Sequence, residues 1–174
     1  KDLKENQRAR LTEYVKYRKN AKYIPVDSYP KGRNAVWSVP CFAAFPSATQ
    51  NELNLEDAKE LIKNGCVCVS EGANMPSTNE AVDFFVAQKI AYGPGKAANA
   101  GGVATSQLEM AQNASMVSWT FEEVDAKLEK IMKHIFDTAS ATAKEFGEPT
   151  NLVLGANIAG FRRVADAMIE QGIV

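Results

Sequence analysis

Three short apolar runs in the sequence are each followed by a stretch of small, amide and hydroxyl residues. Amides and hydroxyls bind a ligand through directional hydrogen bonds without adding charge, and glycines such as Gly101 and Gly102 let the backbone approach a ligand closely. One such stretch is typical of a turn, but three at successive run ends predict a shared binding rim. The candidate residues in PSATQNE, EGANMP and PGKAANAGGVATS are Thr49, Gln50, Asn74, Asn99, Val103 and Ser106.

The apolar runs before these stretches are predicted to be buried strands, and they read VPCFAAFPSA, CVCVSEG and KIAYGPG. Two helices are predicted between them. The first is capped by Asn54 and ends at Gly65, and the second has the capping-box spacing of Ser77 and Glu80. This alternation predicts an α/β fold with about three parallel strands of a Rossmann-like sheet. Ligands of such sheets bind at the carboxyl ends of the strands, where the three stretches lie.

The two ends of the chain are predicted to be helical. Leu3, Leu11, Tyr14 and Val15 share one face of a predicted surface helix whose charges are mixed in sign, which favours a solvated face over a nucleic-acid patch. A loop over residues 23–37 follows. Beyond the third stretch, one long helix is predicted from near Thr120 and another after FGEPTN. We expect residues 1–118 to form a partial dinucleotide-binding domain, and residues 119–174 to form a helical segment that packs back on it.

Composition narrows the class of protein. The 174 residues are 45% hydrophobic and 24% charged, and the net charge of −1 predicts neither a nucleic-acid nor a membrane partner. No apolar run reaches the roughly 20 residues of a membrane span, and the first residues do not resemble a signal peptide. Three cysteines, Cys41, Cys66 and Cys68, are an odd number in apolar surroundings and suit a reducing compartment. We therefore expect a cytoplasmic protein.

Other catalytic or metal-binding patterns are not supported by the spacing. Lys96 lies in a glycine-rich stretch, but no Ser or Thr follows it as a phosphate-binding loop requires. The single histidine, His134, falls within a predicted helix, far from the three stretches, and is assigned to the helix surface. Cys66 and Cys68 lack further zinc ligands nearby and are predicted to be core residues. Glu71 could bind the backbone of its turn or act as a buried acid.

Five motifs carry a resemblance to a known family. ATQNEL, EGANMP, GKAANAGGVATS, LEMAQNAS and GANIAGFRRVADAM resemble, in this order, the carboxyl-terminal part of the hexameric glutamate dehydrogenases of bacteria and fungi. The resemblance covers the chain from Trp37 onward. It implies oxidative deamination of L-glutamate to 2-oxoglutarate and ammonia, and the reverse reaction. It also implies NADP as cofactor, with NAD left open, and a homo-oligomer that is a hexamer in the intact enzyme.

The resemblance also implies roles for the candidate residues. Thr49 and Gln50 would lie near the adenosine of the cofactor, Asn74 near the nicotinamide ribose and Asn99 near the carboxamide. For the substrate, Ser106 would hold the side-chain carboxylate and Val103 would pack beside it. The catalytic lysine and aspartate of the family, and its glycine-rich pyrophosphate turn, match no part of this chain. We therefore expect a fragment with no catalytic residue and no activity of its own.

Three residues depart from the family pattern, namely Phe42, Ser47 and Gln107. Phe42 is expected to alter a hydrogen bond beneath the cofactor loop, and Gln107 to place a long polar side chain beside the substrate contact. Two alternative functions stay open. One is a dehydrogenase of another amino acid on the same scaffold, which a carboxylate-binding Ser106 disfavours. The other is a nucleotide-binding module without chemistry.

Overall fold

The computed structural model describes residues 1–172 and divides into two compact units. Along the sequence, the boundary between them falls between Ala35 and Val36. The first unit holds two helices of one turn, α1 (Asp2–Glu5) and α2 (Tyr14–Tyr17), and 3₁₀ turns at Leu11–Glu13 and Val26–Ser28. The single amino-terminal helix predicted from the sequence is therefore wrong. Of its predicted hydrophobic face only Leu3 is buried, while Leu11, Tyr14 and Val15 are exposed, and short helices need such packing to be stable.

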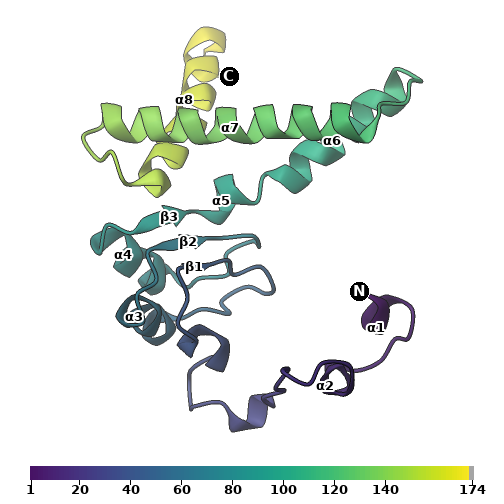
Figure 1. The fold of residues 1–174 in the computed structure, drawn as a ribbon. Helices are drawn as coiled ribbons and strands as arrows, with labels where there is room; N and C mark the ends of the chain where they lie inside the picture. Colours follow the sequence, from purple (N-terminus) through teal and green to yellow (C-terminus); the bar gives the residue numbers. More distant parts are fainter. Residues whose placement is uncertain (173–174) are drawn as a thin grey trace. The chain divides into compact units, whose positions relative to one another are not determined.

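The second unit contains a sheet of three parallel strands in the order β1 (Ala43–Ala44), β2 (Cys68–Ser70) and β3 (Ala91–Gly93), as Figure 1 shows. The strand order follows the chain order, so each strand pairs with the next. This confirms the predicted α/β fold and the three strand positions. The strands are short because their neighbouring residues leave the ladder early to form the loops at the carboxyl ends.

Two helices connect the strands. Asn54 caps α3 (Leu55–Lys63) through a capping box with Asp57, and Gly65, with φ of +88°, follows its end, as predicted. The prediction that Ser77 caps α4 (Asn79–Ala87) is wrong, because the cap is Thr78, whose hydroxyl accepts the N–H of Ala81. Ser77 is buried instead and forms a parallel bridge with Leu53. Because the backbone of Ser77 is paired with Leu53, the helix begins one residue later, after Thr78.

The core lies between the sheet and the helices α3 and α4. Phe85 of α4 stacks on Tyr92 of β3 with ring centroids 5.6 Å apart, and both rings are almost fully buried. Stacked aromatic pairs stabilise a core beyond the area they bury. Leu53, Leu61 and Val69 complete the well-packed centre from the loops, α3 and β2. This core fixes the strand ends from which the candidate site is built.

Helices follow β3 to the end of the described chain. They are α5 (Gly95–Ala98), α6 (Gly101–Ala114), α7 (Phe121–Glu145) and α8 (Leu152–Gln171). The helix α7 begins beside Thr120, as the sequence predicts, and Thr120 caps it through a capping box with Glu123. The predicted domain division at residue 118 falls in the link between α6 and α7 and stays a prediction. Within residues 1–172, none of the helices combines the length and apolar character of a membrane span.

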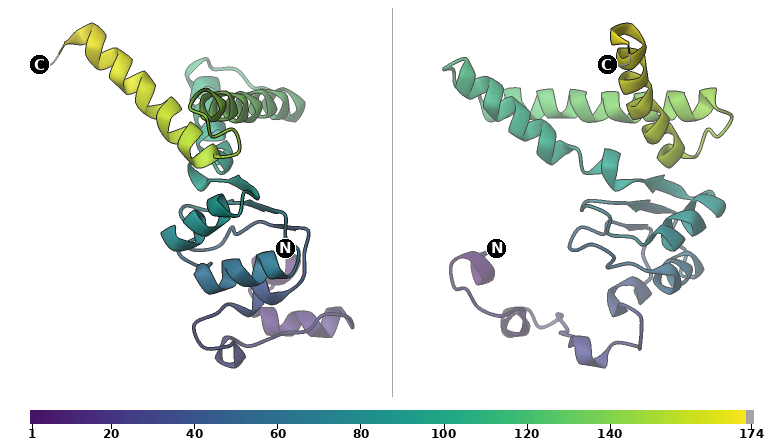
Figure 2. Two further views of the ribbon diagram at one scale, coloured as in Figure 1. Left: turned by 90° about the vertical axis from the view of Figure 1, so that its left-hand side faces the viewer. Right: turned by 180° about the vertical axis from the view of Figure 1, so that it is seen from behind.

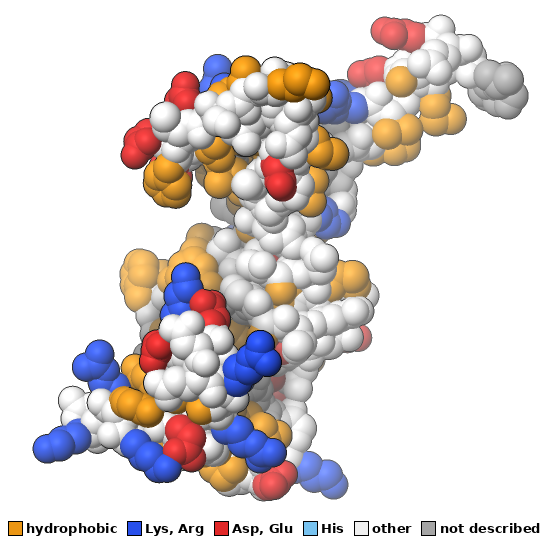
Figure 3. Space-filling view, turned by 90° about the vertical axis from the view of Figure 1, so that its right-hand side faces the viewer, with side chains coloured by type: hydrophobic (Ala, Val, Ile, Leu, Met, Phe, Trp, Pro, Cys, Tyr) orange, Lys and Arg blue, Asp and Glu red, His pale blue; other side chains and the backbone are white. Residues whose placement is uncertain are grey.

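The helices α7 and α8 cross closely, as Figure 2 shows. Gly155 of α8 is buried against α7, and a Cβ atom at this position would overlap the carbonyl oxygen of Ala139 and lie 3.0 Å from the Cβ of Ala143. Only glycine fits at so close a crossing. Beyond the crossing, α8 is open to solvent, and hydrophobic side chains line its surface (Figure 3). The exposed ones are Phe161, Val164, Met168 and Ile169.

Candidate functional site

A cleft of about 530 Å³ opens at the carboxyl ends of β2 and β3, beside the start of α6. The loop after β2, the end of α5 and the first three turns of α6 form its walls. Four of the six residues predicted from the sequence line it. The lining consists of Gly72, Ala73, Asn74, Asn99, Gly102, Val103, Ser106, Gln107 and Met110.

The amides of Asn74 and Asn99 meet in this cleft. Asn74 lies in the loop after β2, and Asn99 is the residue that ends α5. The Asn99 Nδ2 donates a hydrogen bond of 2.6 Å to the Asn74 Oδ1, across 25 residues of sequence. The pair leaves one N–H group of Asn99 and the N–H groups of Asn74 as donors, so the arrangement can bind the polar groups of a ligand from two loops.

Val103 and Ser106 lie three residues apart on α6 and therefore share a face of the helix. Val103 is 67% exposed, and both side chains line the cleft. The Ser106 hydroxyl donates to the carbonyl oxygen of Gly102 at 3.2 Å, four residues earlier. Because Ala100 occupies the helix cap, Ser106 does not cap the helix, and its hydroxyl can rotate away from Gly102 to donate to a ligand in the cleft.

Thr49 and Gln50 do not line the cleft. They lie in an exposed turn that follows β1. This turn is joined to the loop of Asn74, because the backbone N–H of Asn51 donates to the carbonyl oxygen of Met75 at 3.0 Å. The two residues therefore belong to the adjoining rim of the strand ends.

Glu71 is buried and binds backbone groups, so the first of its two predicted roles is the one observed. Its Oε2 accepts the N–H of Gly95 at 2.7 Å, and its Oε1 accepts the N–H of Ser77 at 3.3 Å. The hydroxyl of Tyr92 is buried beside it. Burial raises the pKa of Tyr92, and the neighbouring Glu71 carboxyl raises this pKa further.

Other candidate residues lie outside the cleft. Lys96 of α5 donates a 2.6 Å hydrogen bond to the Oδ1 of Asn157 on α8, and His134 is exposed on α7, as predicted. All three cysteines are free thiols, and burial raises the pKa of Cys41 and Cys68. No group of His, Cys, Asp or Glu side chains suited to a metal ion occurs in the described part of the chain.

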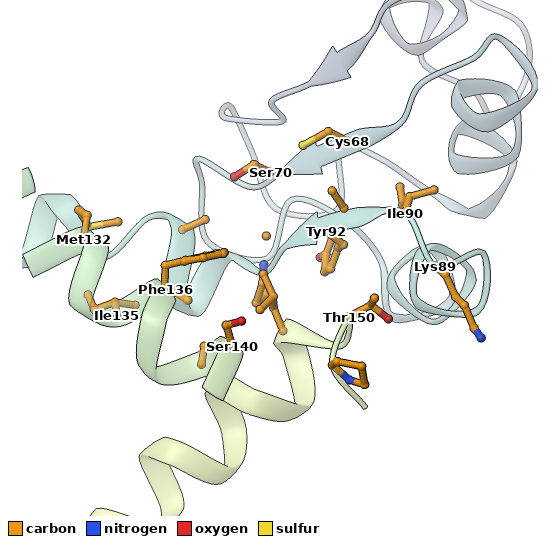
Figure 4. A pocket seen from close by; sticks show the side chains of 18 residues that line it. Cys68, Ser70, Lys89, Ile90, Tyr92, Met132, Ile135, Phe136, Ser140 and Thr150 are labelled. Carbon is orange, nitrogen blue, oxygen red and sulfur yellow. The ribbon is translucent and has the colours of Figure 1, made fainter. Parts of the chain in front are cut away.

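A second cavity, of about 640 Å³, lies between β3 and the helices α7 and α8 (Figure 4). It shares no lining residue with the cleft. Its walls are mainly apolar and include Ile90, Met132, Ile135 and Phe136. None of the residues predicted from the sequence to bind a ligand lies in it, although Ser70 and Gly93, the last residues of β2 and β3, are part of its lining. We therefore assign the candidate site to the cleft.

Sequence reasoning missed part of the cleft. Met110 was not singled out, although its spacing of four from Ser106 and seven from Val103 places all three on one helical face. Gln107 was noted only as a departure, and it does line the cleft. Ser47 packs against Gly72, where an added Cβ would overlap its hydroxyl. The side chain of Phe42 is 78% exposed.

The chemistry of the cleft follows from what lines it. The lining side chains offer amides, one hydroxyl and apolar surface, and none of them is an acid or a base that titrates near neutral pH. Such a set can bind and orient a polar ligand, but it cannot transfer a proton. The lining therefore suits ligand binding and not proton transfer.

Comparisons with known proteins agree on one family. The model described as Glutamate/Leucine/Phenylalanine/Valine dehydrogenase matches residues 1–172. A Helicobacter pylori protein named NADP-specific glutamate dehydrogenase is 65% identical over 173 residues, which are 99% of this chain and 39% of the relative. A Bacteroides thetaiotaomicron protein named glutamate dehydrogenase is 52% identical over 174 residues, which are 99% of this chain and 37% of the relative.

Solved structures give the same result. The crystal structure of Plasmodium falciparum glutamate dehydrogenase matches with a TM-score of 0.89 and 50% identity, and the match covers 99% of this chain and 36% of that one. The chain thus spans 36–39% of the length of these relatives. With a family model matched along residues 1–172, the chain belongs to the glutamate/leucine/phenylalanine/valine dehydrogenase family.

Proposed function

We propose that the chain is part of an NADP-dependent glutamate dehydrogenase, which oxidises L-glutamate to 2-oxoglutarate and ammonia and catalyses the reverse reaction. The observation that carries the proposal is the cleft, where the paired amides of Asn74 and Asn99 lie beside Val103 and Ser106. The 65% identity to a relative named NADP-specific glutamate dehydrogenase supports the activity and the cofactor. NAD stays open as an alternative cofactor.

The proposed roles divide the cleft between two ligands. Asn74 and Asn99 bind the ribose and the carboxamide of the nicotinamide, while Thr49 and Gln50 on the adjoining rim lie toward the adenosine. Ser106 donates its hydroxyl to the side-chain carboxylate of glutamate, and Val103 packs beside the carbon chain. Because the lining carries no acid or base, the groups that transfer protons come from another part of the enzyme.

Glutamate is favoured over apolar amino acids as the substrate. The family model also includes leucine, phenylalanine and valine dehydrogenases, so a different amino acid is the second candidate. The substrate side of the cleft carries the hydroxyl of Ser106 and the amide of Gln107. An apolar side chain would leave these polar groups unpaired, and sites of this kind reject apolar analogues strongly.

We further propose a homo-oligomer, a hexamer in the intact enzyme, in the cytoplasm. The resemblance of the motifs to the hexameric glutamate dehydrogenases supports the assembly, because the chain belongs to their family. Three free cysteines are consistent with a reducing compartment. Neither nucleic acid nor a membrane is proposed as a partner.

A hybrid enzyme tests the function. In it, this chain replaces the matching 173 residues of the Helicobacter pylori relative. We expect glutamate-dependent formation of NADPH by the hybrid, and much lower rates with leucine, phenylalanine or valine. The 174-residue chain alone is expected to give no rate, because its cleft has no group that transfers protons. Preference for an apolar amino acid would favour the second candidate, and a folded hybrid that binds NADPH without turnover would favour a non-catalytic module.

A further inference from the structure

Glu71 connects the two loops that carry Asn74 and Asn99. It stands at the end of β2 and is only 4% exposed. One carboxylate oxygen accepts the N–H of Ser77, which closes the loop around Asn74, and the other accepts the N–H of Gly95, which begins α5. Since α5 ends at Asn99, a single buried side chain holds both amide-bearing segments.

The amide pair cannot hold this geometry by itself. The hydrogen bond between Asn74 and Asn99 lies at the surface, where water competes for the same groups. Hydrogen bonds from backbone N–H groups to a buried carboxylate are charge-assisted and stronger. The hydrogen bonds of Glu71 therefore set the distance between the two loops. That distance decides whether the amides of Asn74 and Asn99 can reach each other.

Gly95 is closely packed against both Glu71 and the loop that carries Asn74. A Cβ atom at Gly95 would lie 2.8 Å from the carbonyl oxygen of Ala73 and 3.0 Å from the Oε2 of Glu71. The start of α5 thus rests directly on the backbone beside Asn74. Any added atom at this contact must push the two amide-bearing segments apart.

Glu71 does not line the cleft, so it is no catalytic residue. Its other neighbours are the buried hydroxyls of Ser77 and Tyr92. The carboxylate is thus occupied with backbone groups of the two loops. A residue in this position can affect a ligand only through the segments that it holds.

We propose that Glu71 is a positioning residue that sets the spacing of Asn74 and Asn99, and with it the affinity for the nicotinamide half of the coenzyme. This inference rests on the proposed function. It assigns the buried carboxylate to coenzyme binding, distinct from both substrate binding and catalysis. The substrate side of the cleft, on α6, lies outside the connection.

The first test is Glu71→Gln in the hybrid enzyme. An amide oxygen can accept from one backbone N–H, but the amide nitrogen then faces the other N–H donor. We expect the coenzyme KM, and the Kd of NADPH from a fluorescence titration, to rise about ten-fold. The KM for glutamate should change by less than about two-fold. Asp57→Asn is the matched control, because Asp57 is equally buried but serves the cap of α3, so it should lower Tm without changing coenzyme binding.

A second variant leaves the charge of Glu71 in place, and it tests the proposal even if Glu71→Gln does not fold. Gly95→Ala should also weaken NADPH binding, because its Cβ forces α5 away from the loop of Asn74. Gly160→Ala, where an added Cβ meets nothing within 4 Å, is its control. If either folded variant binds NADPH like the wild type, the positioning role is overturned. A wild-type hybrid that binds NADPH without oxidising glutamate would overturn the proposed function instead.

Discussion

At the scale of single residues, Ser106 is the sharpest test of substrate binding. Its hydroxyl lies in the cleft and reaches back to Gly102. In the hybrid enzyme, Ser106→Ala removes a charge-assisted bond to the substrate carboxylate, worth about 1.5–3 kcal/mol. We expect kcat/KM for glutamate to fall about ten-fold to over a hundred-fold, while the affinity for free coenzyme changes little.

Thr105→Ala is the matched control for that substitution. The Thr105 hydroxyl makes the same kind of bond, to the carbonyl oxygen of Gly101 at 2.9 Å, but Thr105 does not line the cleft. Both substitutions should have similar small effects on Tm, since such bonds add little to a helix. Equal kinetics for the two variants would argue against substrate contact by Ser106.

Tyr92 provides a prediction about pH. Its hydroxyl is buried beside the Glu71 carboxyl, and its pKa is raised by burial and by Glu71. A raised pKa in the folded state means that stability is full below pH 10 and is lost above it, as the unfolded tyrosine ionises first. Above pH 10 the wild type loses about 1.4 kcal/mol of unfolding free energy for each pH unit until the pKa of the folded state is reached. Tyr92→Phe removes this loss.

Denaturant unfolding at two pH values measures that difference. At pH 7 the free energy of unfolding of Tyr92→Phe should lie within about 1 kcal/mol of that of the wild type, because only one buried hydroxyl is removed. At pH 11 the variant should be more stable than the wild type. A gap between the two proteins that stays constant with pH would contradict the buried, neutral hydroxyl.

At the scale of elements, the crossing of α7 and α8 depends on Gly155. A methyl group there overlaps the backbone of Ala139, so the helices must separate. We expect Gly155→Ala to lower the free energy of unfolding by about 1–3 kcal/mol, as overpacked sites do. Gly160→Ala, on the same helix but in open space, should be neutral or stabilising by up to about 1 kcal/mol. Thermal melts of the two variants give the comparison, and similar Tm values would contradict the close crossing.

Elements governed by local rules were predictable from the sequence. The cap at Asn54, the start of α7 near Thr120 and the three strands were predicted correctly, because side chains a few residues away decide them. The cap of α4 was not, since Ser77 is held by its bridge to Leu53, 24 positions earlier. The amino-terminal helix failed for the opposite reason, as helical propensity without packing is too weak to maintain it.

The candidate site was predictable in its residues but not in its connections. Amides and glycines after strands indicated the rim at Asn74, Asn99 and Ser106, because strand ends of a parallel sheet converge. No spacing rule pairs Glu71 with Gly95, since that bond joins residues 24 apart through the fold. Likewise, the separation of Thr49 and Gln50 from the cleft depends on how their turn leaves the sheet.

At the scale of the whole molecule, the exposed apolar surface predicts association of the isolated chain. In the described residues β1 pairs only with β2, and the flanking Phe42 and Phe45 are 78% and 65% exposed. Unpaired strand edges and large apolar patches tend to join other chains. Light scattering on the 174-residue chain should show a mass that rises with protein concentration. Phe45→Lys, which places a charge beside the edge, should reduce that rise, and a strictly monomeric wild type would refute the prediction.

The close helix crossing has a mechanical consequence. Gly155 rests on α7, and Asn157, two residues on, holds Lys96 of α5 through a 2.6 Å hydrogen bond. At 1.5 Å per residue, Asn157 lies about 3 Å from the crossing along the axis of α8, and Gln171 lies about 24 Å from it. The contact of α8 with α5 therefore lies close to the crossing, whereas the end of α8 lies far from it on the same side. A tilt about the crossing that moved Gln171 by about 8 Å would move Asn157 by only about 1 Å, so little of such a movement would reach α5.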